Sequence, residues 1–346
     1  GMEICPLCAL SVQFLPLSTL RTGEKGRLWF IHTRNCHLAT AVAKRFGWGH
    51  FEPLVAARQR LDFYGSWHSA GEAGAILSLF FQLITELAEH ETTMFDTTHP
   101  INAYIFSNDM REAFLKSIPI PNQILAFLNK LRYLSPFDLR RFRRELLTLD
   151  PHLKGKERAQ RARSIAQTAQ AVLEKRHILT YCLEDDRPYL RGGWTAHRTY
   201  MEEVREMPPW KLELLENVGL RISASEDRKR WVTALRITPR WQLDDLFLGF
   251  VRQGWLTPHG LYLISPPGED SSLDEVRDIL LAVIYEYINC EEDGRSFPKT
   301  QAKSHPPKPD ETYRKIEAIG ARIPVSYTHL RAHETSLHLV CRLLLE

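Results

Sequence analysis

The sequence Ile118-Pro-Ile-Pro-Asn-Gln-Ile-Leu-Ala-Phe-Leu128 marks the point where the chain changes from strands to helices. Each proline disfavours helical backbone in the residue before it, so Ile118 to Pro121 is expected to be extended. Asn122 is then expected to open a helix that carries the apolar residues Ile124, Leu125, Phe127 and Leu128. This stretch therefore predicts a strand that leads directly into a helix.

The segments on either side of this stretch differ in their patterns. On its N-terminal side, Arg27-Leu-Trp-Phe-Ile31 and Ile101-Asn-Ala-Tyr-Ile-Phe106 are typical of strands, and helices are predicted over 37–46 and 70–90. From Pro136 onward helical patterns dominate. They cover 137–149, 155–177, 195–206, 209–217, 226–236, 240–253 and 272–289. The expected fold class is α+β, with a mixed α/β N-terminal part followed by a mainly α-helical C-terminal part.

The expected domain organisation follows these patterns. We expect an α/β domain over 1–135, a mainly helical domain over 136–295 and a linker or tail over 296–323, in which Ser296 to Pro309 is rich in proline and lysine. The last segment, 324–346, is similar to translated sequencing-adapter DNA, notably in Pro-Val-Ser-Tyr-Thr-His-Leu-Arg-Ala-His-Glu-Thr from 324 to 335. It is therefore excluded from fold reasoning.

Composition places the chain among ordinary globular proteins. Hydrophobic residues make up 44% and charged residues 25%, and the net charge of +3 is too small to indicate a nucleic-acid partner by itself. The apolar run 75–87 is too short for a membrane span and is interrupted by Gln82 and Glu86. Few, scattered cysteines and no visible signal peptide favour a reducing compartment, so we expect a cytoplasmic protein without a membrane partner.

Cys5-Pro-Leu-Cys8 is a tight cysteine pair of the kind that holds zinc, because the two-residue spacing folds a knuckle with both sulfurs pointing inward. A structural zinc site needs four ligands, and a second CxxC is absent. Cys36, His37 or His32 could complete the shell, as could a pair upstream of a truncated N-terminus. A redox motif and a pair without function remain alternatives. Cys182 and Cys290 are expected to be structural.

A dense cationic tract follows Pro136. Its members are Arg140, Arg141, Arg143, Arg144, Lys154, Lys156, Arg158, Arg161 and Arg163. On its first helix the pattern places Leu139, Phe142 and Leu146 on one face and Arg140, Arg141 and Arg144 on the opposite face. These arginines, with Lys154, Lys156, Arg158 and Arg161, are therefore the candidate nucleic-acid-binding residues. A solvated helix face is the alternative.

A second stretch interleaves aromatic rings with cations. It contains Tyr181, Arg187, Tyr189, Arg191, Trp194, Arg198 and Tyr200. Stacking rings beside cations suit single-stranded nucleic acid, but packing of these rings in the core is the favoured interpretation. The sequence has no P-loop and no GxSxG, GxGxxG or HExxH motif, so an enzyme activity has no concrete support.

Several short motifs resemble, in order and spacing, the CXXC-CXXC group of CRISPR-associated large subunits of type I Cascade interference complexes. They are Cys5-Pro-Leu-Cys8, Leu15-Pro-Leu17, Gly26-Arg-Leu28, Tyr104-Ile-Phe-Ser-Asn108 and Ile118-Pro-Ile-Pro-Asn122 with Leu125-Ala-Phe-Leu128. The resemblance covers about residues 4 to 130. It implies that Cys5 and Cys8 are the second CXXC of a zinc site whose first CXXC is missing here.

The resemblance also implies a non-catalytic role. Such a subunit binds guide RNA and target DNA, reads the protospacer-adjacent motif, supports R-loop formation in antiviral defence and joins other Cascade subunits. The complex then recruits a separate helicase-nuclease. The alternatives are a metal-dependent nuclease, a CxxC redox protein and a zinc-ribbon module of another nucleic-acid assembly.

Overall fold

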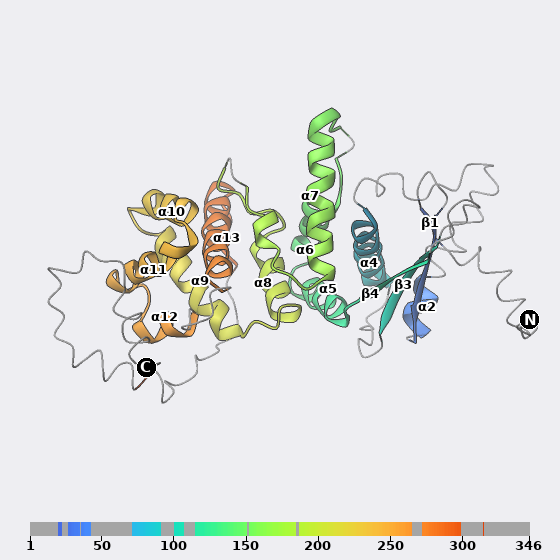
Figure 1. Cartoon of the computed structure of the whole chain (residues 1–346), viewed down its shortest axis with the longest axis horizontal. Helices are drawn as coiled ribbons and strands as arrows, with labels where there is room; N and C mark the ends of the chain where they lie inside the picture. The colour runs from blue at the N-terminus through green and yellow to red at the C-terminus, as the bar shows by residue number, and fades with distance from the viewer. Residues whose placement is uncertain are drawn as a thin grey trace, which may run out of the picture. The chain divides into compact units, whose positions relative to one another are not determined.

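The computed structural model describes residues 20–22, 27–34, 36–42, 71–90, 100–106, 115–150, 152–184, 187–264, 272–298 and 314. In this part of the chain, eleven α-helices accompany one small antiparallel sheet close to the N-terminus (Figure 1). The coarse expectation of strands and helices in the N-terminal part and mainly helices in the C-terminal part is therefore confirmed for the described residues. Cys5 and Cys8, the predicted zinc-knuckle remnant, lie outside the described residues.

The described residues group into two compact units. Unit 1 comprises Gly1–Cys182 with Arg191–Glu206, and unit 2 comprises Leu183–Leu190 with Met207–Glu346. Unit 1 thus contains helices on both sides of residue 135, after which the sequence patterns predicted a domain boundary.

The sheet has four antiparallel strands in sequence order. The strands are β1 (Leu20–Thr22), β2 (Arg27–Thr33), β3 (Ile101–Phe106) and β4 (Leu115–Ile120). On β3 the side chains of Ile101, Ala103 and Ile105 are all buried, whereas Asn102 and Tyr104 between them are half-buried. This alternation is expected when one face of a sheet covers the core.

Four helices of unit 1 share a cluster of buried aromatic rings. The helices of this unit are α2 (Cys36–Val42), α4 (Gly71–His90), α5 (Asn122–Leu134), α6 (Pro136–Phe142), α7 (Gly155–Leu173) and α8 (Trp194–Glu203). Phe142 stacks on Phe81 with ring centroids 5.4 Å apart and meets Phe127 edge-on at 5.6 Å. Phe127 in turn meets Tyr200 edge-on at 5.6 Å. These rings join α4, α5, α6 and α8 in one core, as aromatic pairs commonly do.

Unit 2 is built around a helix pair. Its helices are α9 (Pro209–Ser223), α10 (Arg228–Ile237), α11 (Leu243–Arg252), α12 (Pro258–Ile264) and α13 (Ser272–Glu292). Helix α9 packs against α13 (Figure 1), and a Cβ atom added at Gly219 would lie 2.7 Å from Cγ1 of Val283. Glycine therefore permits the close approach of the two helices.

Two features of the helices differ from the sequence-based expectation. Helix α12 was not predicted, because it is only seven residues long and contains Gly260, a poor helix former. Its residues Leu261 and Ile264 are buried, so tertiary packing outweighs that local preference. The second difference is that the helix expected over 137–149 is not one regular α-helix, as described below. No described helix combines the length and apolar character needed to cross a membrane.

Candidate nucleic-acid interface

Helix α6 carries the first predicted arginines and begins with a standard capping arrangement. The hydroxyl of Ser135 accepts a hydrogen bond from the backbone N–H of Asp138 at 3.2 Å, and Pro136 occupies the first helical turn. A serine cap and an early proline both favour helix initiation. The cap fixes the start of a short helix whose last turn carries Arg140 and Arg141.

The apolar face of this segment is buried as predicted. Leu139, Phe142 and Leu146 are 2%, 0% and 1% exposed. After Phe142 the backbone continues as a π-helical turn, η3 (Arg143–Leu147). A π-turn adds a residue per turn and changes the direction of the side chains that follow, and such turns are frequent at functional sites.

Four arginines between positions 140 and 144 line an open hollow on this segment, and the hollow has a volume of about 420 Å³. Its complete lining is Phe137, Arg140, Arg141, Arg143, Arg144 and Thr148. The structure therefore brings the predicted Arg140, Arg141 and Arg144 together. It adds Phe137 and Thr148, which the sequence analysis did not single out. We call this feature the arginine hollow.

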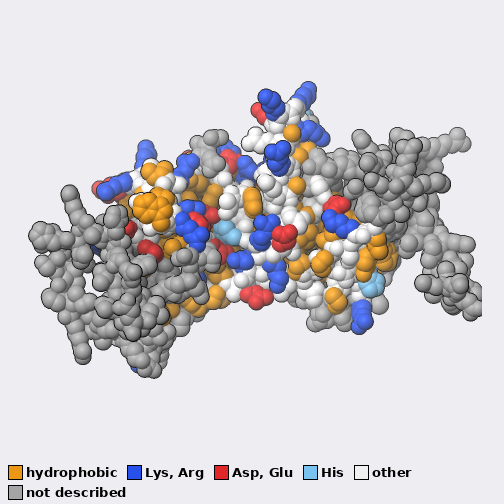
Figure 2. Space-filling view, in the orientation of Figure 1, with side chains coloured by type: hydrophobic (Ala, Val, Ile, Leu, Met, Phe, Trp, Pro, Cys, Tyr) orange, Lys and Arg blue, Asp and Glu red, His pale blue; other side chains and the backbone are white. Residues whose placement is uncertain are grey.

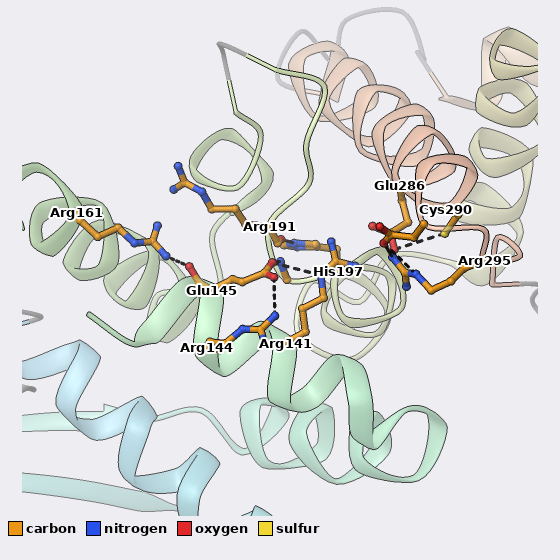
Figure 3. Close-up of polar contacts among 11 residues, drawn as sticks. Arg141, Arg144, Glu145, Arg161, Arg191, His197, Glu286, Cys290 and Arg295 are labelled. Carbon is orange, nitrogen blue, oxygen red and sulfur yellow. Dashed lines mark hydrogen bonds and ion pairs between the residues drawn. The ribbon is translucent and has the colours of Figure 1, made fainter. Parts of the chain in front are cut away.

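Arg141 differs from the expectation that it faces solvent. Its side chain is only 5% exposed, and its Nε lies 3.3 Å from Oε2 of Glu145. Arg144 is 74% exposed, and its Nη2 lies 3.3 Å from Oε1 of the same carboxylate (Figure 3). Arg141 therefore anchors Glu145, whereas Arg144 keeps most of its surface open. Arg140 is also exposed and makes no ion pair with any described residue.

A distant glycine turn buries Arg141. The backbone N–H of Gly192 donates to Oε2 of Glu145 at 2.8 Å. Gly192 and Gly193 both have positive φ angles, 88° and 79°. A Cβ atom added at Gly193 would lie 2.8 Å from Oδ1 of Asp138 and 3.1 Å from Nη1 of Arg141. This turn must therefore be glycine to cover the arginine and its carboxylate.

His197 lies beneath the same turn and is fully buried. Its Nε2–H donates to the carbonyl oxygen of Arg191 at 2.6 Å, and its Nδ1 has no hydrogen-bond partner among the described residues. Burial lowers the pKa of His197 to about 4, with further lowering by the charges of Arg141 and His177. The imidazole is therefore neutral near pH 7, and it adds no positive charge to the site.

The remaining predicted cations lie on or next to α7. Lys154 precedes the helix in extended conformation and is exposed, as is Lys156, whereas Arg158 is half-buried. Arg161 is half-buried and donates to the backbone carbonyl of Glu145 (Figure 3). Figure 2 shows Lys and Arg side chains gathered at the projecting end of α7. Arg161 thus links α7 to η3, and Lys154 and Lys156 present their charges to solvent.

Two of the four interleaved aromatic residues belong to the core, and Tyr181 and Tyr189 are half-buried. Trp194 and Tyr200 are 1% and 0% exposed, and the hydroxyl of Tyr200 donates to the carbonyl of Arg176 at 2.8 Å. These two rings cannot stack on a base. Arg187, which is exposed, lies over the ring of Tyr189 at 4.4 Å from its centroid and makes a cation–π contact with it.

The described residues contain no group of three or more candidate metal ligands. His32, one of the expected zinc ligands, is exposed on β2 and has Phe30 and Tyr104 as ring neighbours. Cys36 and His37 begin α2.

Cys182 and Cys290 are buried free thiols. Burial raises the pKa of Cys182 well above its usual value, and Sγ of Cys290 lies 3.9 Å from Oε1 of Glu286 (Figure 3). Buried protonated thiols are unreactive, which agrees with a structural role.

Comparison of the chain with protein-family models, curated proteins and solved structures gave no match.

Proposed function

We propose that this chain is a non-catalytic nucleic-acid-binding protein, and that it serves as the large subunit of a type I CRISPR Cascade complex. The observation that carries the binding proposal is the arginine hollow, which four arginine residues line and in which Arg144 is 74% exposed. A guanidinium presents parallel N–H donors that match two phosphate oxygens. The order and spacing of the motifs between residues 4 and 130 support the Cascade assignment.

The charges of the hollow suit contact with a phosphate backbone. Glu145 is held by Arg141, Arg144 and the Gly192 N–H, so its charge is largely compensated inside the protein. Arg140 and Arg144 are the exposed cations of the lining. Phosphate contacts position a nucleic acid without reading its bases. In a Cascade complex, guide pairing supplies sequence specificity and the protein reads a short motif and backbone charge.

The proposed partners follow from that role. They are guide RNA and target DNA, other Cascade subunits and the helicase-nuclease that the complex recruits, all in the cytoplasm. Cys5 and Cys8 would bind zinc as half of a tetrahedral shell and would hold local structure.

The binding proposal is tested with the double variant Arg140→Ala/Arg144→Ala. Affinity for labelled single-stranded and duplex DNA is measured by fluorescence anisotropy over a range of salt concentrations. Loss of two phosphate contacts should flatten the slope of log affinity against log salt by about 1.4 to 1.8, the smaller value for single strands. Both side chains are exposed, so the variant should fold.

The matched control is Arg230→Ala/Arg252→Ala, which removes the same charge from exposed positions on α10 and α11. An equal change of slope in both variants would assign binding to net charge and reject the hollow as the contact site.

Cleavage of the DNA by the purified protein with Mg²⁺ would instead support the nuclease alternative. A repeat-spacer array with neighbouring backbone and helicase genes is expected beside the coding sequence, and its absence would count strongly against the Cascade assignment.

A further inference from the structure

Exposed apolar side chains gather where α5 joins α6. The described large hydrophobic residues with the greatest exposure are Leu115, Tyr133, Leu134, Phe137, Ile237 and Trp241. Tyr133, Leu134 and Phe137 are consecutive members of this set within five residues of chain, and each is more than half exposed. Phe137 is 56% exposed and also lines the arginine hollow.

Phe137 is packed less closely than the other large apolar residues of α6. Helix α6 is anchored by Leu139 and Phe142, which are buried, and is capped by Ser135. Phe137 has no polar atom, so its exposed ring surface is unfavourable in water. A ring that contributes little to the core and lies beside several guanidinium groups fits a ligand that is both flat and anionic.

A nucleotide has both properties. Base stacking on an aromatic ring is tolerant of sequence, and neighbouring cations hold the phosphates. The hollow, with a volume of about 420 Å³, has the size of pockets that hold small molecules, which are roughly 300–1,000 Å³. A base within a duplex has both faces covered by its neighbours, so only an unpaired base can place a face on Phe137.

We propose that Phe137 is a stacking platform for an unpaired base whose adjoining phosphates bind Arg140 and Arg144, so that the arginine hollow selects single-stranded over duplex nucleic acid. This inference rests on the proposed function and adds to it the class of ligand that the hollow prefers. Charge complementarity favours this occupant over an apolar protein surface, because such a surface would take the exposed Arg140 and Arg144 out of water without offering them an anion.

The test compares Phe137→Leu and Phe137→Tyr with the unaltered protein. Leucine keeps an apolar side chain but removes the flat ring, whereas tyrosine retains the ring. The probes are a fluorescein-labelled polythymidine strand and a duplex of equal length. Trp241→Leu is the matched control, because Trp241 is 74% exposed and does not line the hollow.

Phe137→Leu should weaken binding of the single strand by a factor of up to about 5 to 150, the range that corresponds to replacement of a stacking ring by alanine. Duplex affinity and the salt slope should stay unchanged, because the phosphate contacts remain. Phe137→Tyr and Trp241→Leu should bind like the unaltered protein. Far-UV circular dichroism should show that all variants fold, since each changed side chain is largely exposed.

The two proposals fail in different ways. If Phe137→Leu binds the single strand normally while Arg140→Ala/Arg144→Ala flattens the salt slope, stacking is rejected and the phosphate site stands. Equal losses for strand and duplex would also reject stacking. If the unaltered protein binds neither probe, the proposed function fails and stacking fails with it. In that case the exposed rings would be assigned to protein docking.

Discussion

Acidification is expected to destabilise the protein through His197. The imidazole is completely buried, donates from Nε2 to the carbonyl of Arg191, and has an Nδ1 without a partner among the described residues. Burial lowers its pKa to about 4, the charges of Arg141 and His177 act in the same direction, and Glu145 opposes them. Protonating this ring in the folded protein is therefore unfavourable.

The sign and size of the effect follow from proton linkage. The unfolded chain binds a proton at this residue with a pKa of about 6.5, whereas the folded protein does so only near 4. The stability that depends on keeping His197 neutral is therefore fully present above about pH 6.5 and is lost as the pH falls toward 4. A difference of about 2.5 pKa units corresponds to about 3 kcal/mol of unfolding free energy.

The assay is urea unfolding followed by circular dichroism at pH values between about 7.5 and 4.5, for the unaltered protein and for His197→Gln. Glutamine retains an N–H donor for the carbonyl of Arg191 but does not titrate. Carboxylates contribute equally to both pH profiles, so the difference between the two proteins isolates His197. We expect the advantage of the unaltered protein to shrink by up to about 3 kcal/mol as the pH falls. Parallel profiles would refute the reasoning.

Two further predictions concern the glycine turn and the cysteine pair. Gly193→Ala should destabilise unit 1 by about 1–3 kcal/mol, because an L-residue is strained at a φ of 79° and the new methyl group would meet Asp138. Thermal unfolding measures this loss, and Gly254→Ala, with a φ of 69° and open space around the added atom, should lose less; equal losses would reject the packing argument. Zinc content by atomic absorption should be low and should fall further in Cys5→Ser, because two thiolates fill half of a tetrahedral shell. A full equivalent of zinc that survives this substitution would contradict the assignment.

Much of the fold could be predicted because its signals are local. The prolines of Ile118 to Pro121 exclude helix, and the structure has β4 ending at Ile120 and α5 beginning at Asn122. Strand β3 covers Ile101–Phe106, as its β-forming residues indicated. The buried face of Leu139, Phe142 and Leu146 also follows from helical spacing, since residues three and four apart share one side.

The composition of the candidate site could be predicted only in part. The sequence pattern identified Arg140 and Arg144 as cations on the polar side of a helix, and both are exposed. It also placed Arg141 on the polar side, although Arg141 is buried. A helical pattern cannot show this, because it contains no information about distant segments such as the Gly192–Gly193 turn. It also gave no signal for Phe137, since one apolar residue near a helix start is as compatible with burial as with exposure.

Sequence by itself therefore determined most of the described elements, though not α12 or the π-helical turn, and the concentration of positive charge after Pro136. Tertiary structure alone decided which of those charges remain available. The Gly192–Gly193 turn comes from a segment far along the chain, covers Arg141 and donates to Glu145 at 2.8 Å. The π-helical turn Arg143–Leu147 supplies Arg143 and Arg144, which line the hollow together with Phe137. The physical reason is that helix periodicity arises from backbone geometry within a few residues, whereas burial of a charge depends on packing between segments that the chain brings together only on folding.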